Sequence, residues 1–306
     1  MPLFSGSLAA FDGALQDEYA RFVGYFPDSP PAFVQHKFAT TGLFPDLGWG
    51  LIGSGVAEAM ARNDAAQLHD TFVRFTACAH AAFGTPDEQG VYPGGCDHCS
   101  LLWPALHSAV LGRGYLASAF ACERPLSVRG YAAYCHAVNA MACLDNPAWD
   151  RRDAALDKAR AYLNAKGKAQ VDKAFVGFFV ALAEADRAAL ADSLEAFAGG
   201  FLKSDWGRYK PLTKPAMLLS MVAYAGLHLE APLAEDTLSR LLPAELRAVW
   251  QAFARDRAVL ARSPFRFGAP LAFLNDGLLP FADDEAAPRA PSHSPATGGK
   301  RSDTEM

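Results

Sequence analysis

The residues best suited to chemistry lie in one short loop, Cys96-Asp97-His98-Cys99. Two thiolates in a Cys-x-x-Cys spacing can supply half of a tetrahedral zinc site, and Cys78 or His80 could complete it. The spacing from Cys78-x-His80 to the loop is not that of a standard zinc finger, and no βαβ pattern supports a thioredoxin-like redox pair. We therefore expect a structural loop, with Cys99 packed inward and His98 near solvent, and keep a metal-dependent enzyme as an alternative.

The rest of the sequence carries no catalytic signature. The eight histidines are scattered, and none forms the His-Glu-x-x-His pattern that places two metal ligands on one helix face. There is no Gly-x-Ser-x-Gly nucleophile elbow, and Gly53-Ser54-Gly55 lacks the lysine and the strand of a phosphate-binding loop. His80 and His136 lie in alanine-rich helical patterns and are expected to be partly buried, with their hydrogen bonds satisfied. The sequence thus predicts no catalytic residues, no metal and no other cofactor.

A different kind of candidate is the stretch Phe201–Pro211, which places aromatic and basic residues between two apolar helical patterns. Tryptophan, tyrosine and arginine are enriched at binding hot spots, because they combine a large contact area with directional hydrogen bonds. In one interpretation, Trp206 and Tyr209 only staple the neighbouring helices while Arg208 and Lys210 are solvated. In the other, the stretch is a partner-binding loop. Its predicted contact residues are Lys203, Asp205, Trp206, Arg208, Tyr209 and Lys210.

The spacing of the apolar residues predicts that an all-α fold carries these stretches. Alanine and leucine dominate, and no alternating β-branched run is longer than about five residues. We expect a single globular array of antiparallel helical hairpins, with about ten helices in a partly repeat-like order. The expected helices span residues 7–25, 51–62, 64–83, 100–120, 127–144, 150–166, 170–185, 186–203, 213–225, 234–241 and 244–261.

Two of the expected turns between helices are similar to each other. Asn63-Asp64 and Ala185-Asp186 each follow one apolar helix and open another, and an alanine, a leucine and a second aspartate recur after both. Aspartate is a favoured N-cap, because its side chain accepts hydrogen bonds from the amides of the first turn. We expect tight αα-hairpins at both places. Two copies are fewer than the roughly three stacked units that a solenoid needs.

Composition divides the 306 residues into three parts. Residues 1–50 are expected to form an N-terminal helix and an irregular lead-in rich in proline and glycine. Residues 51–279 are expected to form the helical domain, and 51% apolar residues in the whole chain are enough to fill its core. Residues 280–306 are rich in Pro, Ala, Ser, Gly and charge, and are expected to be disordered.

Charge and cysteine content restrict the location and the partners. The first residues lack the basic and apolar regions of a signal peptide, and six cysteines suit reduced thiols in the cytoplasm. No apolar run approaches the roughly 20 residues of a membrane helix. A net charge of −5 and a pI near 5.9 disfavour nucleic-acid binding and favour a basic protein partner.

A series of motifs runs from Phe175 to Leu242: a capped hairpin, a Trp-containing turn, a Lys-Pro helix start, and a Gly-Leu segment ending in glutamate before a leucine-rich helix. The residues are Ala185, Asp186, Leu190, Trp206, Lys214 to Leu218, Gly226 to Glu230, Leu238 and Leu241 to Pro243. In this order they resemble the helical immunity proteins of bacterial polymorphic toxin systems, most closely the family numbered forty-nine among them. The hairpin at Asp64 fits the first half of that family, so the resemblance covers Leu51 to Pro243. A second family of helical toxin-neutralising proteins has a similar carboxyl-terminal hairpin.

The resemblance implies a non-catalytic immunity protein that binds a cognate toxin in the cytoplasm and blocks its active site or substrate groove. An acidic face would speed the capture of a basic toxin such as a nuclease. The loop from Cys96 to Cys99 has no counterpart in the pattern of that family. Two alternatives stay open: a helical-repeat adaptor that holds a peptide or protein in a groove, and a metal-dependent enzyme that uses the cysteine loop.

Overall fold

The computed structural model describes residues 7–40, 43–79, 81–82, 102, 105–112, 132–145, 148–262 and 265–275. Every regular element within these ranges is helical, which confirms the predicted all-α class. The C-terminal stretch 280–306 and the loop from Cys96 to Cys99 lie outside the described residues.

Most of the helices pack against their neighbours in sequence. The longer ones are α1 Leu8–Gly24, α2 Pro31–Thr40, α3 Leu43–Arg62, α4 Ala65–Ala79, α7 Ala132–Asp145, α8 Arg152–Asn164, α9 Gln170–Ala183, α10 Arg187–Gly200, α12 Lys214–His228, α13 Glu235–Leu241 and α14 Ala244–Arg262. The short ones are η2 Ala109–Leu111, η3 Phe201–Lys203, α11 Asp205–Tyr209 and η4 Pro211–Thr213.

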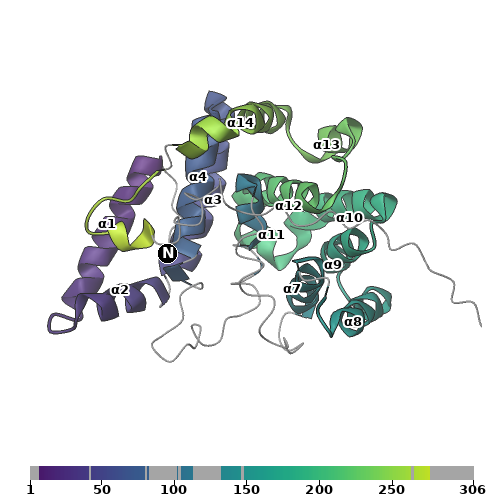
Figure 1. Cartoon of the computed structure of the whole chain (residues 1–306), viewed down its shortest axis with the longest axis horizontal. Coiled ribbons are helices and arrows are strands. Elements are labelled where there is room, and N and C mark those ends of the chain that lie inside the picture. The colour runs from purple at the N-terminus through teal and green to yellow at the C-terminus, as the bar shows by residue number, and fades with distance from the viewer. Residues whose placement is uncertain are drawn as a thin grey trace, which may run out of the picture.

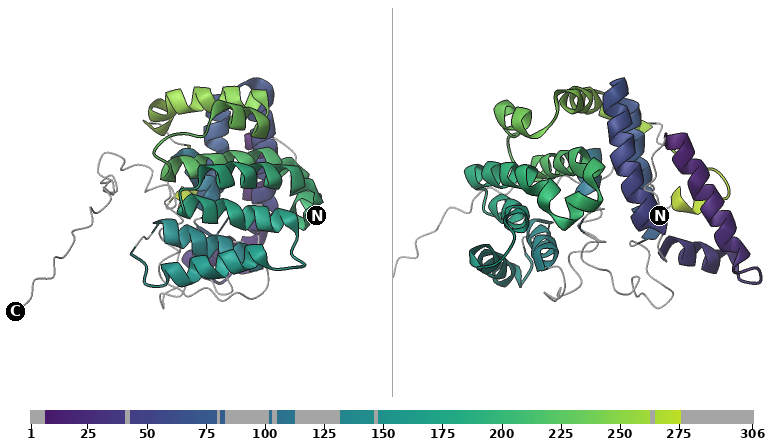
Figure 2. Two further views of the ribbon diagram at one scale, coloured as in Figure 1. Left: turned by 90° about the vertical axis from the view of Figure 1, so that its right-hand side faces the viewer. Right: turned by 180° about the vertical axis from the view of Figure 1, so that it is seen from behind.

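The helices α3 and α4 lie side by side in the middle of the molecule (Figure 1). On one side of this pair lie α1 and α2, and on the other lies a larger group formed by α7 to α10 and α12. From α13 the chain returns through α14, which packs on both α3 and α4. In the side view, α8, α9, α10, α12 and α14 stack with their axes nearly aligned (Figure 2). The fold is therefore a stack of hairpins joined to a central helix pair.

The turns between α3 and α4 and between α9 and α10 have the same backbone design. Asn63 and Ala185 adopt left-handed conformations with φ of 49° and 56°. The next residue, Asp64 or Asp186, donates its backbone N–H to a carbonyl five residues earlier, at 3.0 and 2.9 Å. This bond closes a Schellman motif at the end of the first helix.

The same two aspartates also cap the helices that follow. A carboxylate oxygen of Asp64 accepts from the backbone N–H groups of Ala66 and Gln67 at 2.9 and 3.0 Å. In the second turn, Asp186 Oδ1 accepts from the N–H of Ala189 at 3.0 Å. The predicted N-caps and tight hairpins are confirmed, because one residue ends each first helix and begins the next.

A glycine allows α3 and α4 to approach closely. If Gly55 carried a Cβ atom, this atom would lie 2.4 Å from Oγ1 of Thr71 on α4. Gly53-Ser54-Gly55 thus lies inside a helix and serves packing, in agreement with the expectation that it binds no phosphate.

The helices enclose one large apolar cluster and one small one. Rings from five different helices are completely or almost completely buried in the large cluster, namely Phe11, Phe72, Phe178, Tyr224 and Phe253. The small cluster fills the space between α7, α8 and α9 with Ala133, Ala159, Tyr162, Val176 and Val180. Burial of apolar surface on this scale supplies most of the free energy that favours folding.

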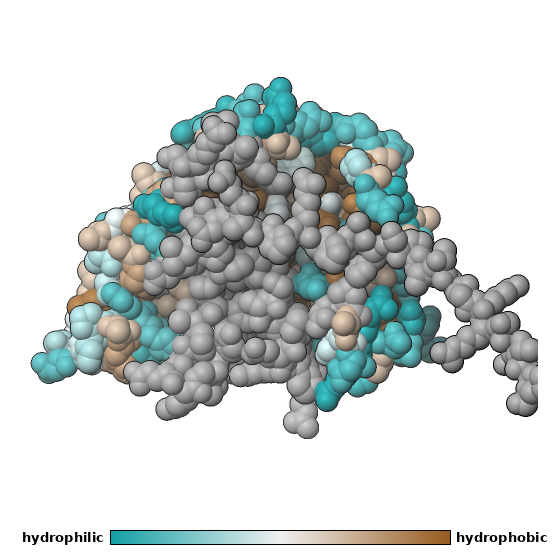
Figure 3. Space-filling view, viewed as in Figure 1, coloured by the Kyte–Doolittle hydropathy of each residue, from teal (hydrophilic) through white to brown (hydrophobic). Residues whose placement is uncertain are grey.

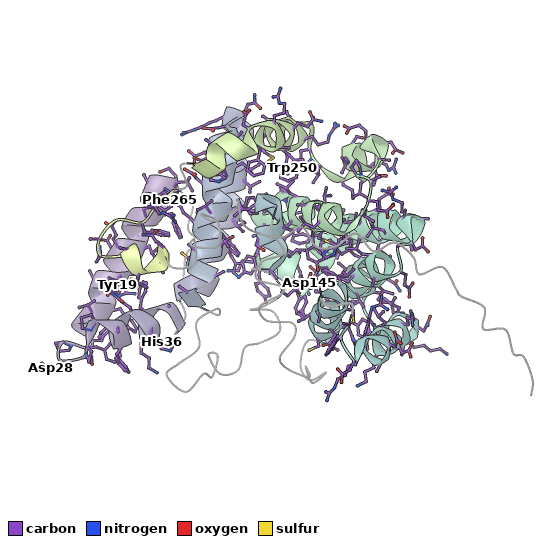
Figure 4. All side chains as sticks on the ribbon, in the orientation of Figure 1. Tyr19, Asp28, His36, Asp145, Trp250 and Phe265 are labelled. Carbon is purple, nitrogen blue, oxygen red and sulfur yellow. The ribbon has the colours of Figure 1, made fainter. Side chains whose placement is uncertain are left out.

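A buried arginine fastens the C-terminal segment to the first helix. Arg74 on α4 donates from Nε and Nη2 to the two carboxylate oxygens of Asp12 on α1, each at 2.9 Å. Its guanidinium carbon lies 3.4 Å from the ring centroid of Phe265, which Figure 4 shows between α1 and α4. In the same C-terminal segment, Phe273 lies 5.5 Å from Tyr19 of α1, measured between ring centroids. The bidentate charge pair and the ring contacts hold the two ends of the described chain together.

The observed helices agree with the expected ones from residue 132 onward to within a few residues, whereas the first part of the chain differs. Pro31–Thr40 forms α2, although the prolines had indicated only a break, because proline fits the first position of a helix. The next helix, α3, begins at Leu43 and not at Leu51. The single helix expected over 100–120 ends earlier, since Gly112 has a φ of 84° after η2.

The left-handed residue at the second turn yields a prediction about stability. Ala185→Gly should raise the free energy of unfolding by ~1 kcal/mol, because alanine is strained at positive φ and glycine is not. The measurement is chemical denaturation followed by circular dichroism. Ala188→Gly is the matched control, since it places glycine inside α10 at an exposed site and should cost ~1 kcal/mol. Equal effects of the two substitutions would contradict the assigned strain.

Candidate partner-binding site

The predicted contact stretch is not an open loop but a series of tight helical turns. We refer to residues 201–214 as the basic corner; it contains η3, α11, η4 and the first residue of α12. The corner contacts α10 through η3, and contacts α3 and α12 through η4. It is therefore placed where three long helices meet.

Side-chain hydroxyl groups fix the backbone of the basic corner. Ser204 Oγ donates to the carbonyl of Phe201 at 2.5 Å and accepts from the N–H of Gly207 at 2.9 Å. Near the end of the corner, Thr213 Oγ1 donates to the carbonyl of Lys210 at 2.7 Å. The Ser204 hydroxyl caps α11 by accepting from the Gly207 N–H. Both hydroxyls also donate a second hydrogen bond to carbonyls that already accept a backbone N–H.

A glycine is required where α11 folds back on η3. A Cβ atom added to Gly207 would lie 2.0 Å from the backbone oxygen of Phe201. No side chain can be accommodated there unless the backbone moves. Since Phe201 is completely buried, the corner is held on the core at this point.

The basic corner exposes an unusual share of apolar surface. Seven large apolar side chains are exposed among the described residues, and three of them, Leu202, Tyr209 and Leu212, belong to this corner. Their exposed fractions are 53%, 76% and 60%. Clustered exposed apolar side chains mark interaction surfaces more often than isolated ones do.

The structure places the six predicted contact residues in one short segment. Lys203 and Arg208 are exposed and Lys210 is half-buried. Tyr209 is exposed, so the interpretation in which it staples two helices is wrong for this residue. The side chains of Asp205 and Trp206 lie outside the described part of the structure, although the backbone of both belongs to α11.

Several acidic side chains lie along α10, which precedes the corner, and along α13. Glu195 and Asp236 both bind Arg240, at 2.8 and 3.1 Å. Glu235 binds Arg247 at 2.6 Å. The space-filling view shows mainly hydrophilic residues over α13 and α14 (Figure 3). Exposed pairs of this kind contribute little to stability and reduce the net field of these acidic side chains.

One serine–histidine pair was not visible in the sequence, because 113 residues separate its members. Ser220 Oγ donates to the carbonyl of Ala216 at 2.8 Å, so the Nδ1–H of His107 donates to Ser220 Oγ at 2.6 Å. Both side chains are completely buried. Burial lowers the pKa of His107 to about 3. A general base needs access to substrate and a pKa near the working pH, so this pair has a structural role.

A second buried polar group joins the ends of α7 and α12. His228 Nε2 lies 3.6 Å from Asp145 Oδ1, and its ring centroid lies 4.7 Å from that of Tyr224. Asp145 Oδ2, the Tyr224 hydroxyl and His228 Nε2 make no hydrogen bond to any described residue. Figure 4 shows Asp145 in the interior of the helix group.

Burial determines the charge of this group. It raises the pKa of Asp145 to about 7 and lowers the pKa of His228 to about 4. The separation of 3.6 Å is too long for a strong hydrogen bond, so we assign neutral side chains to both residues between these pH values. No local sequence pattern could have predicted this group, because its members come from separate helices.

The proposed thiol and histidine ligands are only partly described. Cys78 is buried, and burial together with the charge of Asp12 raises its pKa to about 12, which opposes metal binding through a thiolate. His80, Cys96, His98 and Cys99 lie outside the described residues. Within the residues that are described, no three His, Cys, Asp or Glu side chains gather as a metal site. His136 is buried, but its Nδ1 makes no hydrogen bond to any described residue, so the expected satisfied side chain is not observed; burial lowers its pKa.

The comparisons with known proteins assign this chain to no family. No protein-family model matches the sequence, and neither a curated protein nor a solved structure is significantly similar to it. None of the described helices combines the length and the apolar character needed to cross a bilayer.

The close approach at α11 predicts a large effect of a small substitution. Gly207→Ala should lower the free energy of unfolding by ~2 kcal/mol, because the new methyl group would collide with the Phe201 carbonyl. Gly199→Ala is the control, since no atom lies within 4 Å of its added Cβ, and it should stabilise α10 by ~0.5–1 kcal/mol. Urea denaturation of both variants tests this. A stable Gly207→Ala variant would show that α11 does not pack on η3 in this way.

The buried carboxyl group predicts a pH dependence. Burial raises the folded-state pKa of Asp145 from its ordinary value near 4 to about 7, so the contribution of its neutral carboxyl group to the free energy of unfolding is complete below about pH 4 and is lost as the pH rises through 7. Asp145→Asn cannot ionise, and its stability relative to the native chain should increase by ~2 kcal/mol between pH 5 and pH 8. Guanidinium denaturation across this range measures the difference. Destabilisation of the variant at pH 6 to 8 would indicate a charged pair of Asp145 with His228 instead.

Proposed function

We propose that this chain is an immunity protein, which binds a cognate bacterial toxin in the cytoplasm and neutralises it without catalysing a reaction. The observation that carries the proposal is the cluster of exposed Leu202, Tyr209 and Leu212 within the stretch that the sequence predicts to bind a partner. Tyrosine and arginine are enriched at binding hot spots, and Arg208 and Tyr209 are adjacent and exposed in this stretch.

The rigidity of the basic corner supports the same function. Its turns are fixed by Ser204 and Thr213 and by the close approach at Gly207. A surface that is already ordered loses less conformational entropy when it binds, which favours high affinity. An inhibitor requires such a surface more than it requires reactive groups.

The perturbed titratable groups of the described residues also suit a non-catalytic protein. His107, Asp145 and Tyr224 are buried inside the helix group, and burial is the largest cause of each pKa shift. The motifs around Asp186 and Lys214 that resemble immunity proteins form the capped hairpin and the start of α12, which flank the basic corner. Together these features support a scaffold that presents one contact segment.

The test is co-expression with the proteins encoded by the genes on either side of the gene for this chain, one of which we expect to be a toxin. Growth of a sensitive host should be arrested by that protein alone and restored when this chain is present, with a one-to-one complex after purification. A catalytically inactive toxin variant separates binding from toxicity. A toxic neighbour that forms no complex and is not neutralised would refute the proposal.

A single residue at the centre of the corner should dominate this binding. Tyr209→Ala should weaken the toxin complex by ~2 kcal/mol, about 30-fold in Kd, because it removes the most exposed large apolar side chain of the corner. Isothermal titration calorimetry measures the loss. Tyr25→Ala is the matched control, since Tyr25 is 68% exposed at the end of α1, away from the corner. Equal losses in both variants would place the interface elsewhere.

A further inference from the structure

We propose that the basic corner binds an acidic protein surface with an apolar centre, in which carboxylates surround side chains of leucine or aromatic size. This refines the proposed function and rests on it in taking the partner to be a protein. It also assigns the partner a charge opposite to the one favoured by the net charge of the chain.

The basic corner has a positive net charge, opposite in sign to that of the whole chain. Residues 201–214 contain Lys203, Arg208, Lys210 and Lys214 but one acid, Asp205, so their net charge is +3. The whole chain has a net charge of −5, which leaves −8 for all other residues. A compact cationic segment on an otherwise anionic chain directs an anionic surface toward that segment.

The start of α12 adds to this local field. Lys214 is the first residue of this 15-residue helix, and its first turn contains no acid. A helix N-terminus has a partial positive charge, so a lysine there is slightly unfavourable for the isolated helix. Both the lysine and the helix end favour an approaching carboxylate, and neither is explained by the stability of α12.

Three exposed apolar side chains lie in short helices that contact one another. Leu202 and Leu212 lie on the two sides of α11, within η3 and η4, and Tyr209 ends α11 between them in sequence. Aliphatic groups gain affinity by excluding water from a matching apolar surface, which a highly charged polymer alone does not offer. The corner therefore fits a partner that presents apolar groups and carboxylates together.

Two other sources of negative charge are less compatible with the surface. Nucleic acids bind through many phosphate contacts, and a charge of −8 on the remaining residues opposes a long polyanion. An anionic bilayer would likewise face this repulsion over a broad area. A protein can place its acidic patch opposite the corner alone.

A basic toxin would instead require the acidic side chains along α10 and α13. These acids are engaged in part by the chain itself, since Arg240 binds both Glu195 and Asp236. The carboxylate of Glu184 binds Arg160 in the same manner. Arg208 and Lys210 also interact within the chain, so the two surfaces differ in the sign of their net charge and not in whether their charges are paired.

The experiment uses the full chain and defined probes. An amphipathic peptide of about 20 residues, with a leucine stripe flanked by glutamates, is compared with the same peptide carrying lysine for glutamate. Fluorescence anisotropy at ~50 mM and ~300 mM NaCl gives the affinities. Hydrogen exchange locates the bound segment. A single-stranded oligonucleotide and phosphatidylserine vesicles are the competing anionic probes.

Charge reversal within the corner is compared with reversal outside it. The double variant Arg208→Glu with Lys210→Glu should weaken binding of the acidic peptide by ~10-fold or more and remove its salt dependence. Lys158→Glu with Lys166→Glu changes the net charge equally at two exposed sites in and after α8, and should have little effect. Circular dichroism confirms that both variants fold.

The expected result is that the acidic peptide binds tighter than the basic one and protects residues 201–214. Equal affinity for both peptides, equal losses in the two double variants, or tighter binding of the oligonucleotide or vesicles would overturn the proposal. Neutralisation of the toxin is not needed for any of these readouts. If the acidic peptide binds as expected and the toxin is not neutralised, the proposed function fails and the assigned charge of the partner surface stands.

Discussion

The fold depends on two tight turns, in each of which one aspartate ends one helix and caps the next. At Asp64 and at Asp186, the N–H group closes the preceding helix and the carboxylate caps the next one. When the chain reverses within two residues, the second helix runs antiparallel to the first, and the apolar faces of both helices can pack against the same neighbouring helices. The central pair and the largest stacked hairpin both arise in this way, and the other helices pack on them.

The interior contains polar groups in arrangements with very different electrostatic character. Arg74 is matched by the two oxygens of Asp12, so its charge is retained inside the molecule. In contrast, Asp145 and His107 have no partner of opposite charge at hydrogen-bond distance among the described residues, and burial shifts both pKa values toward the neutral form. The core thus retains a charged side chain where two hydrogen bonds from a carboxylate compensate the charge, and its buried titratable groups without such a partner are shifted toward the neutral form.

The features that could be predicted from the sequence are mostly local. The Asp caps, the hairpins and the longer helices from α7 to α14 follow from residue preferences within a few positions, whereas the short helix α11 was not expected. The second helix was missed because proline ends a helix or opens one, and only the packing of Val34 and Phe38 decides between them. The exposed position of Tyr209 agrees with a contact site, and binding through this residue stays a prediction.

The pairs that connect distant parts of the chain could not be predicted. Ser220 meets His107, and His228 meets Asp145, only after α12 has packed against earlier helices. Nothing in the residues around either histidine distinguishes it from the others in the sequence. Such contacts are a product of topology, and a single sequence has no local pattern for them.

The contacts of Arg74 with Asp12 and with Phe265 have a consequence for the order of folding. The first helix leaves the ribosome early, yet the rings that cover it, Phe265 and Phe273, are synthesised last among the described residues. Contacts between opposite ends of a chain raise its contact order and delay completion of that region. The capped hairpins can form as soon as they are synthesised, whereas the aromatic rings of α1 stay partly uncovered until Phe265 and Phe273 are in place. The amino-terminal region is therefore expected to complete its folding late and to be the part of the described chain most exposed to aggregation while it folds.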